Sequence, residues 1–400
     1  MPQARRTVYA FFYFRDGRFF DVGLLLRGTA KAVSTKQVLA ISILAGEEFI
    51  VSEDDVGLFR ELPSDRWVEV GADERVLSLA RKGLVLVDIE KEPFTTFRAR
   101  DEEFAANQWN IYGALQHSMT KWGGIDFRGD LREIGAALEE LPVVPEDVLE
   151  AYIRDHGPPP PTFHARSDAL AMHPLPAVDS RGPLQELLAR RKTTRAWDRS
   201  TPMTEAELAT VLDAAFGVRG YAPILPGLVG LHKASPSGGG LHPTEAYPLV
   251  TAVEGVEPGL YHYRAEDGAL ELLERIPPEE GVELATRFTC GQSYFGSAHV
   301  TVILAARFYR SFWKYRRHQR AYGALLMDAA HLSQTHYLVC AELGLGAFVT
   351  FAINGVDIEE RLGLDGVAEG AVLVCGCGRP ASESPLDPTF LPYVPGETEI

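Results

Sequence analysis

The sequence predicts an α+β fold, in which a small α/β module precedes a larger C-terminal domain. Three observations support this prediction. A proline run at 158–161 separates two stretches of different pattern, and such runs form stiff extended connectors. Strand-like and helix-like segments alternate on both sides of it. One long segment, 322–343, is apolar on nearly every side, which a helix tolerates only when a core or a partner subunit buries it.

Composition limits the classes of protein that are possible. The chain has 400 residues, 46% of them hydrophobic, and a formal net charge of −16. Its four cysteines are too few for a disulfide framework. No apolar run approaches the ~20 residues of a membrane span, and the N-terminus lacks the pattern of a signal peptide. We therefore expect a cytoplasmic protein that does not enter a membrane.

Residues 1–100 predict a winged-helix-like module. Two strands are expected to meet in a hairpin at Asp16-Gly17. Further on, Asp73 is placed to cap a helix that Gly83 ends, and a buried strand follows at 84–87. The module holds 15 Lys/Arg and 15 Asp/Glu, so its net charge is zero, which argues against nucleic-acid binding. Two roles remain for this module. It could dock a peptide through an edge strand near 7–14, or it could be purely structural.

Residues 101–180 predict a helical extension and a proline-rich linker, and 181–400 the main domain. A capping box at Thr204 and Glu207 begins a helix that Gly217 closes. Strands are expected at about 247–254, in a hairpin turning at Asp267-Gly268, and at 299–308 and 370–376. The apolar face of the capped helix comprises Leu208, Val211, Leu212, Ala215 and Phe216.

Three stretches contain residues suited to chemistry. "ARRKTTRAW" (189–197) offers guanidinium groups and hydroxyls that can grip a phosphate, or forms a solvated basic turn. "SPSGGGLHP" (235–243) lets a backbone approach a flat ligand closely, or forms a flexible surface loop. The segment 307–320 gathers six Lys/Arg and a histidine, with aromatics interleaved, or forms a solvated helix face. "CGCG" (375–378) lacks a second Cys/His pair nearby in the sequence, so we expect a buried strand and no metal.

Taken together and in this order, these motifs resemble the nitroreductase superfamily of FMN enzymes. The glycine-rich stretch and the Lys314-Tyr315 pair ahead of the long helix are most similar to the SagB-type dehydrogenases, which include the azoline oxidases of peptide maturation. The resemblance covers about 180–380. More loosely, it also covers the N-terminal extension, because relatives carry a region related to a winged-helix element for leader peptides. It implies a nitroreductase-like FMN domain with a mixed sheet and a long helix at a homodimer interface.

The resemblance also implies which residues bind FMN. The basic and hydroxyl residues of "RKTTR" correspond to a cradle for phosphate, ribityl and pyrimidine oxygens, and the glycine loop to a wall along the ring. Many nitroreductases have an asparagine at the position of Gly240. A later turn would offer a backbone N–H to the flavin, and a last arginine would assist at the phosphate. The implied set is Arg191, Lys192, Thr193, Arg195, Ser235, Pro236, Ser237, Gly238, Gly239, Gly240, Phe351, Ala352 and Arg379.

Lys314 and Tyr315 match the pair implicated in catalysis in azoline oxidases. Converting an azoline to an azole removes one proton and one hydride, so a base must take the proton from carbon. Neighbouring arginines and the flanking residues Phe312 and Trp313 favour a neutral lysine amine. Adjacent residues on a helix point about 100° apart. We therefore expect 310–318 to be irregular, with the helix beginning near Arg320.

The implied function is FMN-dependent oxidation of thiazoline or oxazoline rings to thiazole or oxazole in a ribosomally synthesised peptide. The precursor peptide and a cyclodehydratase would be the partners, and oxygen the final electron acceptor. An NAD(P)H-dependent reductase of the same fold, acting on dehydroamino acids, nitro groups or enones, is the alternative among enzymes. A flavin-binding scaffold that holds the precursor without turning it over is the alternative outside enzymes.

Overall fold

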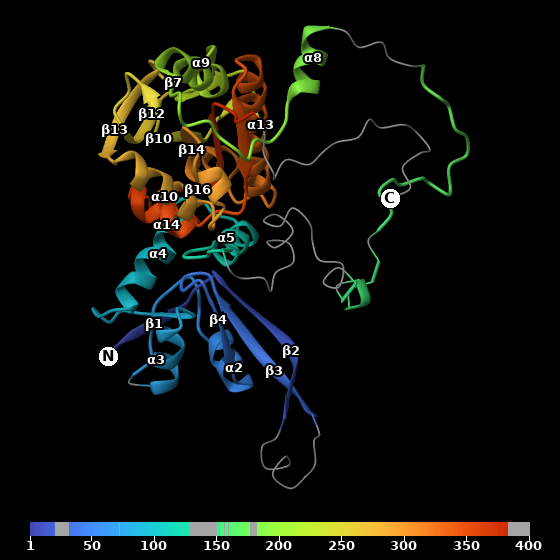
Figure 1. Ribbon diagram of the computed structural model, residues 1–400. Coiled ribbons are helices and arrows are strands. Elements are labelled where there is room, and N and C mark those ends of the chain that lie inside the picture. The colour runs from blue at the N-terminus through green and yellow to red at the C-terminus, as the bar shows by residue number, and fades with distance from the viewer. Residues whose placement is uncertain are drawn as a thin grey trace.

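The computed structural model describes residues 1–20, 32–71, 73–128 and 182–382, together with 150–176 apart from 152, 156 and 159. Figure 1 shows the N-terminal strands below a larger body of sheet and helices. No helix among these residues combines the length and apolar composition that a bilayer crossing requires. The predicted α+β class is present, with an N-terminal extension before the main domain.

The N-terminal region contains two three-stranded sheets. In the first, β1 (Gln3–Arg6) lies between β5 (Val68–Glu69) and β6 (Val85–Val87). In the second, β3 (Ala32–Ser42) lies between β2 (Ala10–Phe20) and β4 (Glu47–Val51). Two helices, α2 (Glu53–Glu61) and α3 (Glu74–Arg81), complete this region.

Local signals placed α3 correctly. Asp73 is its N-cap and accepts a hydrogen bond from the backbone N–H of Arg75. Gly83 follows the helix with a φ of +64°, in the left-handed region that glycine enters without a steric penalty. The buried strand predicted at 84–87 is present as β6, all three residues of which are buried.

The predicted hairpin at Asp16-Gly17 is wrong. β2 runs through this dipeptide without a break, with Asp16 opposite Lys36 and Gly17 opposite Thr35 in an antiparallel ladder. A two-residue turn is a local preference, whereas eleven paired positions form a continuous run of backbone hydrogen bonds between the two strands. The ladder overrides the turn signal here.

Two helices, α4 (Phe94–Ala106) and α5 (Ile111–Met119), connect the N-terminal region to the main body (Figure 1). Trp109, between them, is 1% exposed. Its indole N–H donates to the carbonyl of Val367 at 2.8 Å, and its ring centroid lies 4.7 Å from that of Phe308 and 4.9 Å from that of Phe312. One hydrophobic cluster therefore extends from the N-terminal residue Tyr9 to the centre of the main domain.

The main domain is built on a six-stranded sheet in the order β13-β12-β10-β14-β16-β15, and every pairing within it is antiparallel. A parallel pairing, between β7 (Met203–Thr204) and β11 (Val253–Glu254), lies outside it. A separate hairpin joins β8 (Gly220–Leu225) to β9 (Leu228–His232). The sheet strands are β10 (Thr244–Val250), β12 (Gly259–Arg264), β13 (Ala269–Arg275), β14 (Val300–Arg307), β15 (Gly346–Thr350) and β16 (Glu369–Gly378).

Helices cover both faces of this sheet. Along β14, Val302 and Leu304 belong to the core cluster of one face, and Ile303 and Ala305 to that of the other, as the alternation of a strand requires. The capping box of α9 and its apolar face are confirmed. The helices of this domain are α8 (Pro183–Arg190), α9 (Glu205–Phe216), α10 (Pro278–Phe288), α11 (Ser293–Gly296), α12 (Phe308–Tyr315), α13 (Ala321–Glu342) and α14 (Gly355–Leu362).

The long helix α13 packs on the sheet with one side and leaves the other side uncovered in the single chain. Leu325, Ala329 and Leu332 are buried in the core, whereas Met327 is 61% exposed. The exposed side comprises Gly323, Met327, Ala330, His331 and Gln334. The sequence predicted a helix that is apolar all round, and this uncovered side is where a partner subunit would have to lie.

Candidate active site

The segment that follows α8 is held between the sheet and α13. Thr193 forms a parallel bridge with Ala347 in β15, and its hydroxyl lies 2.9 Å from that of Tyr337. The Arg191 guanidinium lies 5.3 Å from the centroid of the same Tyr337 ring. Lys192 lines a cavity together with Tyr337, and Arg195 belongs to the same short segment, which thus contains three cations.

A cavity of about 190 Å³ opens beside this segment. Its lining includes Arg190, Lys192 and Thr194 together with Tyr337 and the 344–347 turn. The Thr194 hydroxyl is buried and has no hydrogen-bond partner in the structure, which is costly unless a ligand supplies one. Two cations and an unpaired hydroxyl around a small cavity fit a phosphate or ribityl group, so these residues suit a mononucleotide such as FMN.

The glycine loop is anchored to α13 through a buried carboxylate. Asp328 accepts hydrogen bonds from the Ser237 hydroxyl at 2.6 Å and from the Gly238 N–H at 3.0 Å. Burial raises the pKa of Asp328, although both hydrogen bonds oppose this. Nearby, the Ser235 hydroxyl lies 2.6 Å from that of Thr335. These contacts fix residues 235–238 on the helix, while Pro236 is exposed.

Beyond this anchor the loop makes a 3₁₀ turn, Gly238–Gly240, in which Gly239 has a φ of +65° and Gly240 a φ of +68°. A Cβ on Gly239 would lie 2.5 Å from the Lys314 Nζ and 2.6 Å from the Tyr315 hydroxyl. The polar ends of both side chains therefore touch the glycine loop. The structure brings together two motifs that lie 75 residues apart in the sequence.

The prediction that 310–318 is irregular is wrong for 310–315 and correct for 316–318, which lie between the two helices. Helix α12 continues through Lys314 and Tyr315 and ends at Arg316, which has a φ of +52°, and the long helix begins after Arg320 as predicted. Phe308 and Phe312 stabilise α12 because both pack on Trp109. Lys314 and Tyr315 still meet at one place, because both side chains are long and lie in the last turn.

The surroundings of Lys314 also differ from those expected. Phe312 is 2% exposed and packs into the core with Trp109, and Trp313 is 36% exposed. These two aromatics therefore do not enclose the amine. Its aromatic neighbour is Tyr315, whose ring centroid lies 5.4 Å from the Nζ.

The turn after β15 contains Phe351 and Ala352. Phe351 is 68% exposed, and the backbone N–H of Ala352 donates to the Thr350 hydroxyl at 3.2 Å. Both residues line a cavity of about 450 Å³ that also touches Tyr322 at the start of α13 and Trp122 after α5. The expected ring-binding turn thus lies beside a large cavity that the helical extension helps to close.

Arg379 lies apart from the phosphate cradle. Its guanidinium donates to the Glu207 carboxylate at 2.8 Å and to the carbonyl of Pro202 at 3.2 Å. Glu207 is the capping-box residue of α9, so Arg379 ties the end of the last strand to the start of that helix. Arg379 does not line the 190 Å³ cavity.

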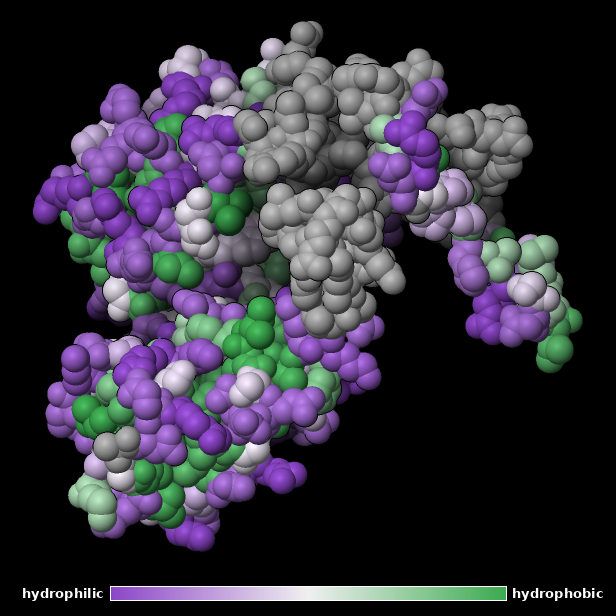
Figure 2. Space-filling model, turned by 90° about the horizontal axis from the view of Figure 1, so that it is seen from below, coloured by the Kyte–Doolittle hydropathy of each residue, from purple (hydrophilic) through white to green (hydrophobic). Residues whose placement is uncertain are grey.

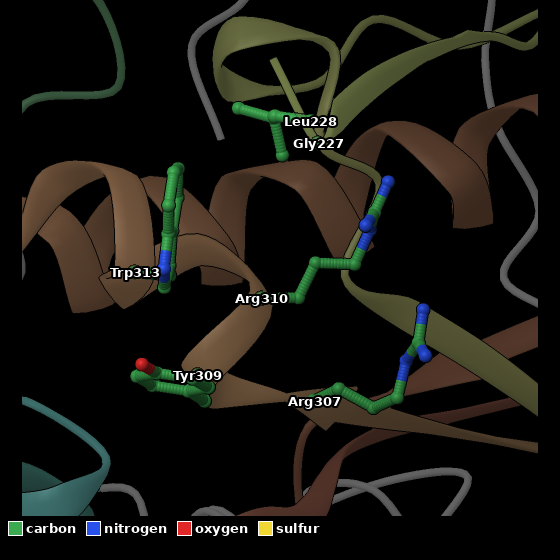
Figure 3. A pocket seen from close by; sticks show the side chains of 6 residues that line it. All are labelled: Gly227, Leu228, Arg307, Tyr309, Arg310 and Trp313. Atoms are coloured by element: carbon green, nitrogen blue, oxygen red, sulfur yellow. The ribbon is translucent and has the colours of Figure 1, made fainter. Parts of the chain in front are cut away.

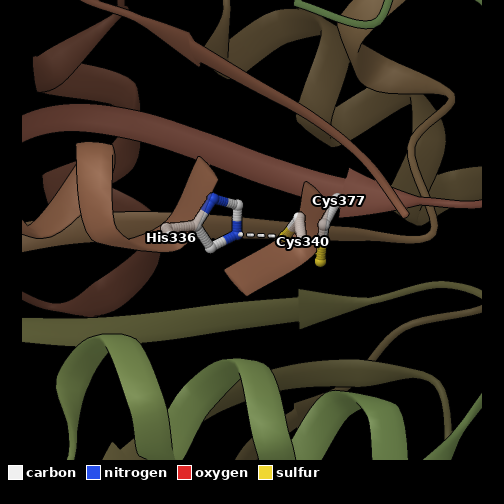
Figure 4. A group of neighbouring side chains, drawn as sticks. All are labelled: His336, Cys340 and Cys377. Carbon is white, nitrogen blue, oxygen red and sulfur yellow. Dashed lines mark hydrogen bonds between the residues drawn. The ribbon is translucent and has the colours of Figure 1, made fainter. Parts of the chain in front are cut away.

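The "CGCG" strand meets two potential ligands from α13. His336, Cys340 and Cys377 are buried, and one ligand atom of each lies within 4.8 Å of the others (Figure 4). A hydrogen bond from Cys340 lowers the pKa of Cys377, whereas burial raises that of Cys340. The sequence expectation of a simple buried strand missed this cluster, because Cys377 lies 37 residues after Cys340 and 41 after His336.

Sequence reasoning also missed Asp328 and Tyr337. Asp328 anchors the glycine loop, and Tyr337 contacts both Thr193 and Arg191. A signal for Asp328 was present, because it is the one acidic residue within the otherwise apolar segment 322–341. Tyr337 carried no comparable signal, since an aromatic in a buried helix is usually a core residue.

Comparisons with known proteins agree with this architecture. The model of the nitroreductase family matches residues 188–379. A putative nitroreductase of Methanocaldococcus jannaschii, MJ1384, is 32% identical over 182 residues, which are 45% of this chain and 83% of that protein. The chain belongs to the nitroreductase family. It is therefore a member of a family of oxidoreductases that typically bind flavin.

Two further similar proteins have names that refer to peptide processing or synthesis. The trifolitoxin-processing protein TfxB of Rhizobium leguminosarum bv. trifolii is 31% identical over 148 residues, which are 36% of this chain but 38% of that protein. The Escherichia coli microcin synthetase McbBCD complex with truncated pro-MccB17 bound contains a chain that is 19% identical, with a TM-score of 0.44 over 63% of this chain and 92% of that one.

Proposed function

We propose that this protein is a SagB-type, FMN-dependent dehydrogenase that oxidises thiazoline or oxazoline rings to thiazole or oxazole in a ribosomally synthesised peptide. The observation that carries the proposal is the contact of Lys314 and Tyr315 with Gly239. Membership of the nitroreductase family accounts for a basic segment and a glycine loop. It does not by itself require a lysine and a tyrosine in contact with that loop. The likeness to a trifolitoxin-processing protein adds support for peptide maturation.

The proposed cofactor contacts are those that the family resemblance implies. Arg191, Lys192, Thr193 and Arg195 would hold the phosphate and ribityl groups. Lys192 lines the 190 Å³ cavity, where the Thr194 hydroxyl would gain the partner it lacks. The glycine loop 235–240 would lie along the flavin ring. When bound, FMN supplies a two-electron acceptor for the hydride that leaves the azoline.

The residues of the chain would then handle the proton. The Lys314 amine would take the proton from the ring carbon, and the Tyr315 hydroxyl beside it would orient the ring or relay that proton. Asp328 would act as a positioning residue, because it fixes the loop that both side chains touch.

The N-terminal region, about residues 1–100, is proposed to hold the precursor peptide. β2 is an eleven-residue edge strand, which can pair with an extended chain. Phe14 on β2 is 70% exposed and Ile50 on β4 is 61% exposed, and Figure 2 shows apolar side chains among charged ones on this side of the molecule. A cyclodehydratase would supply the azoline, and a second copy of the chain would cover α13.

The decisive experiment compares variants on an azoline-containing precursor and detects azoles as the loss of two hydrogen masses per ring. Lys314→Ala should keep FMN and lose roughly 10²–10⁴-fold in turnover, as for a general base. Tyr315→Phe should lose less if the hydroxyl only orients the substrate. Arg275→Ala removes an exposed cation, paired with Glu257 at the end of β13 and outside the proposed sites, and serves as the control. A Lys314→Ala enzyme that makes azoles at the wild-type rate would refute the proposal.

A reductase that uses NAD(P)H is the second candidate, because the match to a putative nitroreductase spans most of that protein. The two candidates differ in the direction of electron flow. Rapid NAD(P)H consumption with nitro or enone acceptors, in a preparation that forms no azoles, would favour the reductase. Turnover of the precursor without NAD(P)H would favour the dehydrogenase.

A further inference from the structure

The segment 307–320 contains several arginines besides Lys314, and two of them line a second cavity. This cavity has a volume of about 390 Å³ and lies between the N-terminal part of α12 and the β8–β9 hairpin. In Figure 3, Tyr309 and Trp313 lie on one side of it and the guanidinium groups of Arg307 and Arg310 on the other. Gly227 and Leu228 complete the lining.

The walls of this cavity carry positive charge. The six lining residues include two arginines and no carboxylate. Arg310 donates to the backbone carbonyls of Leu241 at 2.6 Å and Val229 at 3.1 Å, and carbonyl groups do not neutralise its charge. Burial lowers the pKa of Arg310, and the charge of Arg307 acts in the same direction.

The carboxylates close to the two arginines already interact with several positively charged groups. Arg307 pairs with Glu245 at 2.8 Å, and Glu245 also lies 3.6 Å from His262. Lys233, which is 6% exposed, also interacts favourably with Glu245 and unfavourably with both arginines. Glu369, the other carboxylate that interacts with Arg307, is a weaker acid than usual because burial raises its pKa. An anion in the cavity would therefore meet a local excess of positive charge, within a chain whose net charge is −16.

The opposite wall is apolar and accessible. Tyr309 is 41% exposed and Trp313 is 36% exposed, so both rings are available to a ligand. The Arg316 guanidinium lies 5.9 Å from the Trp313 ring centroid, so a further cation contacts this aromatic wall. A ligand that satisfies both walls needs a negative charge next to an apolar group.

We propose that this cavity binds an acidic residue of the substrate peptide together with a neighbouring apolar side chain. The inference rests on the proposed peptide substrate and deepens it. Arg307 is the N-cap of α12 and Lys314 lies in its last turn, seven residues further on, which is about 10 Å along the helix axis. An extended peptide covers that distance in about three residues. The acidic residue is thus expected about three positions from the ring that Lys314 deprotonates.

The test measures binding directly, with the full-length FMN-loaded protein. The probes are two coumarin-labelled pentapeptides with blocked ends, Gly-Leu-Glu-Gly-Gly and Gly-Leu-Gln-Gly-Gly, followed by fluorescence anisotropy. Wild-type protein should bind the Glu peptide about ten times more tightly than the Gln peptide, as a charge-assisted contact predicts. Arg307→Gln should abolish this preference. Arg361→Gln, which removes an arginine paired with Glu274 on another surface, should retain it.

A second variant guards against misfolding of the first. Trp313→Ala should weaken both peptides equally, by a few fold, and should leave the Glu preference intact. Equal binding of both peptides to wild-type protein, or a preference that survives Arg307→Gln, would overturn the inference. Tight competition by 2′,5′-ADP would also overturn it, because the cavity would then serve a dinucleotide. If the Glu preference is found but no azole forms, the proposed reaction fails and the binding site stands.

Discussion

The contact between the glycine loop and the Lys-Tyr pair can be perturbed by one methyl group. Alanine at Gly239 would place its Cβ 2.5 Å from the Lys314 Nζ and 2.6 Å from the Tyr315 hydroxyl. Both atoms are the ends of flexible side chains, so they can retreat by about 1 Å at little cost in stability. Displacing reacting groups by about 1 Å can reduce turnover by ~10²-fold. We therefore expect Gly239→Ala to lose about two orders of magnitude in azole formation.

The neighbouring glycine offers a matched control. Gly240 has nearly the same backbone conformation, with a φ of +68°, so alanine at either position carries a similar strain of about 1–2 kcal/mol. A Cβ on Gly240 would meet its nearest atom at 3.6 Å, an ordinary contact. Gly240→Ala should therefore lose thermal stability as Gly239→Ala does, yet remain within a few fold of wild-type turnover.

The assay compares initial rates of azole formation per bound FMN, with melting temperatures measured in parallel. Normalising to bound FMN separates a misplaced base from a lost cofactor. If both variants lose turnover equally, backbone strain explains the loss, and the contact with Lys314 and Tyr315 has no catalytic role. If neither loses turnover, the pair is not positioned by this loop.

Three further outcomes are expected. Arg191→Ala should weaken FMN binding by about 1.5–3 kcal/mol, roughly 10- to 150-fold in Kd, measured by fluorescence titration of the apoprotein, and unchanged affinity would remove Arg191 from the cradle. Met327→Glu should convert a dimer into a monomer by light scattering, and a monomeric wild-type protein would contradict the α13 interface. Burial and the hydrogen bond with Asp365 raise the pKa of Glu103 to about 7, so its contribution to stability is present at low pH and is lost as pH rises through about 7. The melting temperature of wild-type protein should thus fall relative to that of Glu103→Gln between pH 5 and pH 8, and parallel curves would refute this.

Elements with short-range signals were predictable from the sequence. The capping box at Thr204 and Glu207 satisfies the first backbone donors of α9 within one turn, and it is present as predicted. The turn at Asp267-Gly268 joins β12 to β13, as its residue types indicate. In both cases the decisive contacts lie within a few residues of one another, so no knowledge of the remaining fold is needed.

Elements determined by distant partners were not predictable. Asp16-Gly17 carries the residues of a turn, but pairing with β3 makes it part of a strand. The helical form of 308–315 depends on Phe308 and Phe312, which pack on a tryptophan some 200 positions earlier in the sequence. The buried cluster of His336, Cys340 and Cys377 likewise exists only once α13 lies on β16.

The burial of Trp109 has a consequence for how this protein can change in evolution. Its ring completes the packing beneath α12, and one hydrophobic cluster unites residues from Tyr9 to Cys377. The N-terminal region is therefore not an interchangeable attachment. Exchange of this region together with α4 and α5 would succeed only if the donor brought an equivalent side chain to pack against Phe308 and Phe312. The N-terminal region and the main domain would then be inherited together, so they would diverge by point substitution rather than by exchange of domains.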